Sequence, residues 1–403
     1  MPANSYDTAM TASPTFNPPT RVLMGPGPSG AHPRVLRAMT APILGHLDPE
    51  FLKIMDNCND MLRKVMMTEN RITIATPGTG TSGMEAAVMN LVEPGDKVVV
   101  GICGYFGERI AQMAERSGGQ VTRVQAPWGS PTDFAGVEAA VKAAGNVKLV
   151  GIVHAETSTG VQTPVEPYAK LAHDAGALLL VDCVTSLGGV PVTVDAWGAD
   201  AVYSGTQKCL SAPPGMAPLT LSPRAWDAVK AREVPCNTWY LDLSLLEAYW
   251  DERRAYHHTA PISMVYALHE ALALVLDEGL ENRWARHEQN GRALQAGFEA
   301  MGLVLHADEG YRLPVLTTVR IPDGVNDLEV RGALLKRHSI EIGGGLGDLR
   351  AKVWRFGLMG ESSNPGNVLL ALSSFGKILR EQGFKADIRA GLSAATAGLE
   401  GSA

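Results

Sequence analysis

The sequence predicts an α/β protein with a mostly parallel sheet and helices on both faces. Three observations predict this fold class. Short apolar runs alternate with longer helical patterns between residues 71 and 182, as in sheets whose strands are joined by crossing helices. One run, Ala-Leu-Leu-Leu-Val at 177–181, is apolar throughout, which is typical of a strand buried on both faces. The chain has 403 residues, 45% of them apolar, enough for more than one domain.

The alternation defines the elements of the first part of the chain. Strands are predicted at 72–75, 97–102, 121–125, 149–154, 177–182 and shortly after 200, and helices at 82–91, 106–117, 134–144 and 165–175. In such sheets, ligands bind beyond the carboxyl ends of the strands. The polar residues that fall at these ends are Thr79, Glu156, Asp182 and Lys208. Spacing alone therefore predicts a binding site at this edge.

The rest of the chain predicts a second, smaller domain. Residues 216–250 complete the large domain, and a helical stretch over 262–286 leads out of it. Further strands are predicted at 303–305, 317–321 and 353–356, further helices at 325–337 and 364–381, a glycine-rich loop near the site at 342–347 and a frayed tail from 390. We expect an N-terminal arm at 1–20, a large domain at 21–280 and a small α+β domain at 281–403.

Composition excludes several classes of function. The net charge of −7 argues against nucleic acid as a partner. The sequence has no run of 18 or more apolar residues, so no membrane-spanning helix is predicted. The first 20 residues are polar and do not resemble a secretory signal. The five cysteines are odd in number and lack metal-ligand spacing, so we expect reduced thiols in a cytoplasmic protein.

Two residues at predicted strand ends suggest a cofactor. Lys208 ends a polar turn after a short strand, and Asp182 directly follows the apolar run. Alone, such a lysine is usually a solvated surface residue, and such an aspartate is often a turn former or a helix cap. Together they match pyridoxal phosphate, which needs a lysine for a Schiff base with its aldehyde and an acid for its ring nitrogen.

A glycine-rich turn leaves a second cofactor class open. Gly-Thr-Gly-Thr-Ser-Gly at 78–83 follows a strand and precedes a helix, and it matches the dinucleotide-binding pattern. A nicotinamide-dependent dehydrogenase is therefore the alternative. However, the turn comes after some 70 residues rather than at the first strand–helix junction. A single phosphate at the helix start, with the hydroxyls of Thr79 and Thr81, suits pyridoxal phosphate equally well.

Two further polar features need an explanation. Arg355 stands inside the apolar strand predicted at 353–356; an arginine there is either in a structural salt bridge or clamps a substrate carboxylate with two hydrogen bonds. His257 and His258 are adjacent, but neighbours in sequence are expected to point apart and no third ligand is evident, so we predict no metal site.

The motifs together resemble those of the class V aminotransferases of fold type I, most closely the alanine–glyoxylate and serine–pyruvate aminotransferases. The matching segments are 25–29, 78–81, 156–160, 181–182, 204–208, 256–259 and 353–358, in an order that covers roughly residues 21 to 380. The resemblance implies pyridoxal 5'-phosphate as cofactor. It also implies a large domain with a seven-stranded, mostly parallel sheet and a homodimer whose active sites are shared.

The resemblance also implies a role for each candidate residue. Lys208 binds the aldehyde and moves the proton, Asp182 binds the ring nitrogen, and Arg355 binds the substrate carboxylate. Phe106 stacks on the ring, with a core phenylalanine or Tyr105 as alternatives. The other implied positions are Thr79, Gly80 and Thr81 around the phosphate, Ser186 and Gln207 as polar neighbours of the ring and phosphate, Thr157 near the phenolic oxygen, Gly25 at the mouth of the site, and Tyr256 and Thr259 at the partner subunit's cofactor.

The expected reaction moves an amino group from a small amino acid, alanine or serine, to the 2-oxo acid glyoxylate. Serine–pyruvate and ureidoglycine–glyoxylate aminotransferases are the alternatives within the family. A cysteine desulfurase is disfavoured because all five cysteines precede residue 237 and Gln207 replaces the usual histidine. A binding module without catalysis is disfavoured because Asp182, Lys208 and Arg355 are all present.

Overall fold

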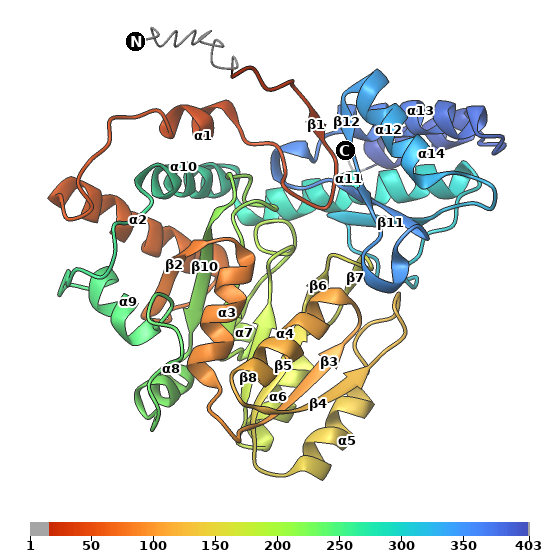
Figure 1. The fold of residues 1–403 in the computed structure, drawn as a ribbon. Helices are drawn as coiled ribbons and strands as arrows, with labels where there is room; N and C mark the ends of the chain where they lie inside the picture. Colours follow the sequence, from red (N-terminus) through yellow and green to blue (C-terminus); the bar gives the residue numbers. More distant parts are fainter. Residues whose placement is uncertain (1–15, 402–403) are drawn as a thin grey trace, which may run out of the picture.

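The computed structural model describes residues 16–401, so most of the predicted arm at 1–20 lies outside the described part. A seven-stranded sheet forms the centre of the larger body (Figure 1). Its strands are β2 (Ile72–Gly78), β3 (Lys97–Ile102), β4 (Gln120–Gln125), β5 (Val147–Val153), β8 (Leu178–Asp182), β9 (Ala201–Tyr203) and β10 (Gly215–Leu221). Their order is β2-β10-β9-β8-β5-β3-β4, and only β10 runs antiparallel to its neighbours. The predicted mostly parallel sheet is confirmed.

Helices between the strands cover this sheet. They are α3 (Gly80–Leu91), α4 (Tyr105–Arg116), α5 (Phe134–Ala144), α6 (Glu166–Asp174), α7 (Val194–Trp197) and α8 (Pro223–Lys230), with α1 (Pro33–Ala38), α2 (Pro49–Met66), α9 (Leu243–Trp250) and α10 (Ile262–Glu278) beside them. α3 packs on β9 and β10, α4 on β3 and β4, and α6 on β8. The predicted helix over 262–286 is interrupted at Gly279, whose φ of 81° ends α10. The short pair β6 (Ala155–Glu156) and β7 (Val161–Gln162) follows β5.

A second core lies at the upper right of Figure 1. Its elements are α11 (Leu280–Ala300), β11 (Leu316–Arg320), α12 (Asp327–His338), β12 (Ile340–Glu341), β13 (Gly343–Gly344), β14 (Val353–Gly357), α13 (Pro365–Glu381) and α14 (Ile388–Glu400), with single 3₁₀ turns at Gly347–Leu349 and Gly360–Ser362. β11, β14 and β13 form an antiparallel sheet. The strand β1 (Val22–Leu23) pairs with β12, and Met24 is buried in this second core.

The tail from residue 390 was predicted to be frayed, and this prediction is wrong. α14 packs along α11, and small residues allow the two helices to approach closely. A Cβ on Gly391 would lie 2.3 Å from Met301 Cγ, and one on Gly297 would lie 3.2 Å from the Gly391 carbonyl. Glycine lowers helix propensity, but here the close packing against α11 outweighs it.

Two other predictions need correction. The run 303–305 forms no strand; although its side chains alternate between buried and exposed, only Leu305 bridges to Val319. The glycine-rich segment 342–347 is partly a strand, since Gly343 and Gly344 pair with Arg355 and Trp354 of β14. Glycine is required beside them because a Cβ on Gly345 would lie 1.8 Å from the Leu349 carbonyl oxygen.

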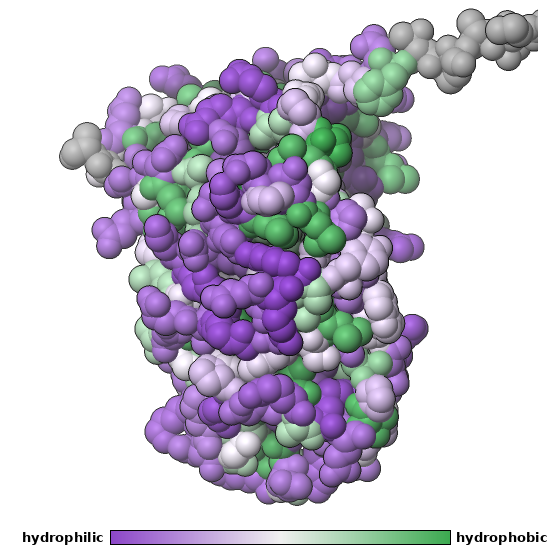
Figure 2. Space-filling model, turned by 90° about the vertical axis from the view of Figure 1, so that its left-hand side faces the viewer, coloured by the Kyte–Doolittle hydropathy of each residue, from purple (hydrophilic) through white to green (hydrophobic). Residues whose placement is uncertain are grey.

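The outer face that carries α2 and α9 is mostly hydrophilic, with a few hydrophobic groups between the polar residues (Figure 2). Within residues 16–401, no helix combines the length and the apolar character needed to cross a membrane.

Candidate active site

A cavity of about 210 Å³ lies at the carboxyl ends of β5 and β8, where the spacing of polar residues predicts a site. Its lining residues are Gly80, Thr81, Met84, Phe106, Arg109, Val153, Ala155, Thr157, Asp182, Val184, Gln207 and Lys208. A larger, open depression of about 670 Å³ lies near α2 and α9. Its arginines are paired with carboxylates, for example Arg254 with Asp56, so the smaller cavity is the better candidate.

Asp182 ends β8 with its carboxylate held from two sides. The Val184 backbone N–H donates to Oδ1 at 2.8 Å, and the Tyr203 hydroxyl donates to Oδ2 at 2.7 Å. Tyr203 stands opposite Asp182 in the pairing of β8 with β9. Only 2% of Asp182 is exposed, and burial raises its pKa to about 6 although both donors lower it. A buried carboxylate with a fixed orientation is suited to bind a cationic ring nitrogen.

Lys208 approaches the same cavity from the turn after β9. It is 8% exposed, and its Nζ donates to the Pro26 carbonyl. Burial, and next the charge of Arg355, lower the pKa of Lys208 to about 8. Gly27, with a φ of 106°, leaves room for the lysine, because a Cβ there would lie 2.8 Å from Lys208 Cδ. The amine is therefore confined and has a larger neutral fraction near pH 7 than an ordinary lysine.

The peptide that carries Lys208 is also fixed. Its carbonyl oxygen accepts hydrogen bonds from the Ser29 hydroxyl at 2.6 Å and from the Ser211 backbone N–H at 3.1 Å. The N-terminal segment 25–29 thus holds both the amine and the backbone of this lysine.

Arg355, in the middle of β14, is 6% exposed. Its Nε donates to the Gly344 carbonyl at 2.8 Å and its Nη1 to the Thr157 carbonyl at 3.2 Å. It forms no ion pair with a carboxylate of the described residues, so the structural salt bridge is not found there. Burial lowers its pKa to about 10, while the charge of Glu156 raises it. A buried guanidinium bonded only to carbonyls can bind the carboxylate of a ligand.

The glycine-rich turn is only partly at the cavity. Gly80 and Thr81 line it at the start of α3, where free backbone N–H groups favour an anion. Thr79 is the N-cap residue, but its side chain makes no capping hydrogen bond and is exposed outside the lining. Gln207 lines the cavity, and its Oε1 is buried without a hydrogen-bond partner, which leaves it free for a ligand.

The aromatic wall of the cavity is Phe106, whereas Tyr105 does not line it. The Arg109 guanidinium lies 4.9 Å from the centre of the Phe106 ring, and its Nη1 donates to the Thr81 hydroxyl at 3.0 Å. The ring of Phe106 is therefore held by a cation–π contact.

Thr157 also lines the cavity and shares a hydrogen bond with the Thr185 hydroxyl.

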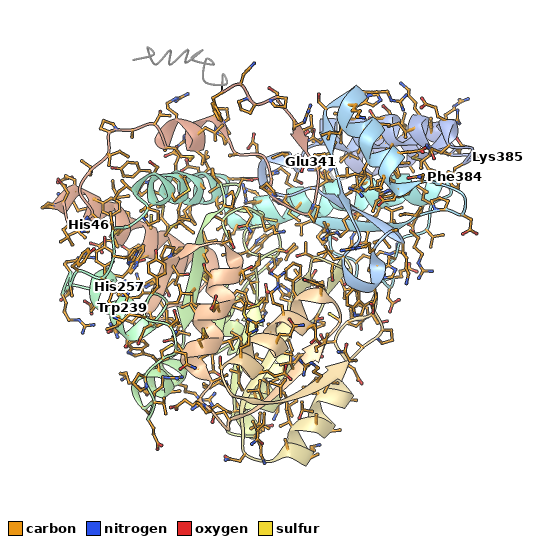
Figure 3. All side chains as sticks on the ribbon, in the orientation of Figure 1. His46, Trp239, His257, Glu341, Phe384 and Lys385 are labelled. Carbon is orange, nitrogen blue, oxygen red and sulfur yellow. The ribbon has the colours of Figure 1, made fainter. Side chains whose placement is uncertain are left out.

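Six predicted residues lie outside this lining: Thr79 and Arg355, described above, and four others. Ser186 is buried and its hydroxyl has no partner. Gly25 lies against the backbone of Gly343. Tyr256 and Thr259 are both exposed, in the loop before α10. Figure 3 labels His257 of this loop beside α9.

The two adjacent histidines contact each other, and the prediction that they point apart is wrong. His257 Nδ1 and His258 Nδ1 are 2.8 Å apart, and His257 stacks on Trp239 with ring centres 4.3 Å apart. The irregular loop allows both rings to turn inward. Within residues 16–401, no three His, Cys, Asp or Glu side chains are grouped to hold a metal ion.

Sequence reasoning missed several residues of the site. Tyr203 is next to Asp182 only because β9 pairs with β8. Arg109 stands three residues after Phe106 in α4, a spacing that places both on one helix face and could have identified it. Met84 and Val184 gave no signal beyond being apolar.

The amino-acid sequence matches the family described as aminotransferase class-V over residues 34–348. The chain is a class V aminotransferase. It is 48% identical to the solved alanine–glyoxylate aminotransferase from Nostoc sp., with coverage of 94% of this chain and 100% of that one and a TM-score of 0.90. For the ureidoglycine–glyoxylate aminotransferase from Bacillus subtilis the identity is 41%, the coverage 96% and 99%, and the TM-score 0.93. For the pyridoxamine–pyruvate aminotransferase from Mesorhizobium loti the identity is 31%, the coverage 97% of this chain and 100% of that one, and the TM-score 0.92.

The aminotransferase uses pyridoxal phosphate, the cofactor of its family, which excludes the nicotinamide alternative. The cavity fits this cofactor. It offers a buried carboxylate, a confined amine, an aromatic wall and a helix start for a phosphate. The unpaired Gln207 Oε1 is a further polar group available to it.

Proposed function

We propose that the aminotransferase moves an amino group from a small amino acid, alanine or serine, to glyoxylate. The observation that carries this proposal is the buried guanidinium of Arg355, which has no carboxylate partner among the described residues and whose charge acts on the Lys208 amine. A 2-oxo acid and an α-amino acid both present a carboxylate to such a group. Glyoxylate is favoured because the Nostoc and Bacillus relatives are both named for it. Serine–pyruvate and ureidoglycine–glyoxylate transfer are the alternatives.

In this proposal the substrate is held by Arg355 and its proton is moved by Lys208. Arg355 binds the α-carboxylate and so fixes the Cα–H bond toward the lysine. Lys208, with a pKa near 8, takes the proton from Cα in its neutral form and returns it to the cofactor side. Bound pyridoxal phosphate supplies an aldehyde for the amino group and a ring that withdraws electrons from Cα.

The remaining residues hold the cofactor in this proposal. Asp182 keeps the ring nitrogen protonated, and Phe106 covers the ring. Thr157 lies near the phenolic oxygen. The phosphate would be held by Thr79, Gly80 and Thr81, and Ser186 and Gln207 would be polar neighbours of the ring and phosphate. Gly25 forms the mouth of the site through its backbone.

The donor and acceptor can be tested with a panel of substrates. We expect the purified holoenzyme to transfer amino groups from alanine or serine to glyoxylate with kcat/KM at least about tenfold above that with pyruvate as acceptor. Serine is measured with both acceptors by following hydroxypyruvate, and alanine is measured with glyoxylate alone, because exchange between alanine and pyruvate gives no net product. Equal use of pyruvate with serine would favour serine–pyruvate transfer. Turnover of ureidoglycine alone would favour the other alternative.

We also propose a homodimer in which Tyr256 and Thr259 contact the cofactor phosphate of the partner subunit. Tyr256 is 64% exposed, and it stands beside His46 with ring centres 5.3 Å apart. The exposed aromatic side chains of Trp239 and Tyr240 lie against His257 of the same loop. An exposed apolar surface of this kind favours contact with another chain.

A mixed dimer tests the shared site. One chain carries Lys208→Ala and the other carries Tyr256→Phe with Thr259→Ala, and subunit exchange is confirmed by differently tagged chains. One site then has both lesions, while the other has native Lys208, Tyr256 and Thr259. We therefore expect the mixed dimer to recover about half of the wild-type activity, as the arithmetic of two independent sites requires. Sites built within one chain would give no recovery and no class of tightly bound cofactor.

We propose the cytoplasm as the location. All five cysteines lie in the described residues as free thiols, and four of them are buried. This agrees with a protein folded in a reducing compartment.

A further inference from the structure

Glu156, the last residue of β6, is fully buried and accepts four hydrogen bonds. Oε1 accepts from the Ser158 backbone N–H at 3.0 Å and from its hydroxyl at 2.7 Å. Oε2 accepts from the backbone N–H groups of Phe106 at 3.1 Å and Gly107 at 3.3 Å. Both oxygens therefore act only as acceptors, which an ionised carboxylate can do and an amide cannot.

The carboxylate serves as the cap of α4 from another part of the chain. The N-cap residue, Gly104, has no side chain to bind the first N–H groups of the helix. Instead, Glu156 binds the second and third of them, and the Ser158 hydroxyl accepts from Tyr105 N–H at 2.9 Å. Gly104 is needed to admit this group, because a Cβ there would lie 2.4 Å from Glu156 Cγ. Negative charge at a helix start is stabilising.

The same carboxylate connects two walls of the site. On one side it fixes the backbone of Phe106, whose ring lines the cavity. On the other side it fixes the turn 156–160, in which the Gly160 N–H donates to the Glu156 carbonyl at 2.9 Å. Thr157 in this turn lines the cavity, and its carbonyl accepts from Arg355. Glu156 itself does not line the cavity, so it acts through these neighbours.

Glu156 also carries a charge that acts on the site. Burial raises the pKa of its carboxyl, and the four donors lower it. Its negative charge raises the pKa of Arg355, of Lys208 and of Asp182. The buried carboxylate of Glu156, like that of Asp182, therefore lies near the site, and its charge favours the protonated form of Arg355 without direct contact.

We propose that Glu156 is a positioning residue that fixes the Phe106 ring relative to the Arg355 guanidinium and thereby sets the affinity for the amino-acid substrate and for the cofactor. This proposal rests on the function proposed above in one respect: it assumes that Arg355 binds the substrate carboxylate. The binding of pyridoxal phosphate to the enzyme does not depend on which amino donor is used.

Glu156→Gln tests this. Its amide nitrogen must face either the Ser158 pair of donors or the α4 pair, so one pair loses its acceptor. We expect the KM for the amino donor and the dissociation constant of pyridoxal phosphate each to rise at least about tenfold, with a smaller change in kcat at saturation. Glu156→Asp keeps the charge but is one methylene shorter, and we expect it to restore part of both affinities.

Asp200→Asn is the matched control. Asp200 is 2% exposed and accepts from Leu179 N–H at 2.9 Å and the Ser222 hydroxyl at 2.8 Å, at the start of β9 and thus at the opposite end of the sheet. It also contacts Arg224 at 3.2 Å and His173 at 3.1 Å. This variant should lower Tm and leave KM and cofactor affinity within about twofold of wild type. If Glu156→Gln behaves in the same way, Glu156 is merely structural and the proposal is overturned.

Ser158→Ala keeps the test decisive if Glu156→Gln fails to fold. It leaves the carboxylate in place but removes the hydroxyl that joins Glu156 to Tyr105 N–H. We expect a rise of about two- to fivefold in KM and in the cofactor dissociation constant. No change in either would overturn the proposal. If no donor of the panel reacts with glyoxylate, the cofactor dissociation constants still decide the role of Glu156.

Discussion

Lys208→Ala is expected to lower the rate of the half-reaction with an amino donor by at least about 10³-fold. Proton transfer by a positioned side chain typically contributes about 10²–10⁴-fold, and Lys208 is the only lysine that lines the cavity within the described residues. The variant should fold, since the side chain makes a single hydrogen bond, to the Pro26 carbonyl. Stopped-flow absorbance of the variant loaded with pyridoxal phosphate measures the half-reaction directly.

A matched lysine separates the loss of this amine from a general loss of charge. Lys377 is exposed on α13, far from the lining of the cavity, and Lys377→Ala should react at the wild-type rate. An added small amine such as methylamine should restore part of the rate of Lys208→Ala, because it can take the proton in place of the side chain. Near wild-type turnover by Lys208→Ala would mean that another group moves the proton.

Asp182→Asn should bind pyridoxal phosphate but react several orders of magnitude more slowly. The amide has the size of the carboxylate: its oxygen can still accept from the Val184 N–H, and its NH2 can donate to the Tyr203 hydroxyl oxygen. It has no charge, however, so it cannot keep the ring nitrogen protonated and the ring cannot withdraw electrons from Cα. Single-turnover rates with a saturating amino donor measure the effect.

Tyr203→Phe is the control for Asp182→Asn. It removes the hydrogen bond to Oδ2 but keeps the negative charge of Asp182. We expect a loss of less than about 10²-fold, since one hydrogen bond to a charged group contributes about 1.5–3 kcal/mol. If the two variants lost the same amount, the orientation of the carboxylate would matter more than its charge, and the assigned role of Asp182 would be wrong.

The parts of the fold that were predictable are those in which local pattern and tertiary environment agree. The apolar run before Asp182 is a buried strand in any parallel sheet, and its bounds differ from the structure by one residue. The prediction for the tail after residue 390 was wrong because its glycines are unfavourable for an isolated helix. Their use, a close contact with α11, depends on a neighbour that local sequence does not reveal.

The site divides in the same way. Lys208, Asp182 and Arg355 each stood out because a charged group followed or interrupted an apolar run. Tyr203 could not be placed, since its contact with Asp182 depends on which strands are neighbours in the sheet. Glu156 was placed at a strand end, but its function as a cap for α4 depends on the distant Gly104.

The pairing of β1 with β12 joins an early part of the chain to a late one, which has a consequence for folding during synthesis. Met24 leaves the ribosome early, but the groups that bind its backbone, the Glu341 carbonyl and the Gly357 N–H, are synthesised much later. Until then, β1 lacks its partner strand, and the segment after Met24 is held only from its other end, where Ser29 binds Gln207 and Lys208. Contacts between such distant positions form late. We therefore expect the seven-stranded sheet, whose strands all precede residue 222, to be able to form before β1 gains its partner strand.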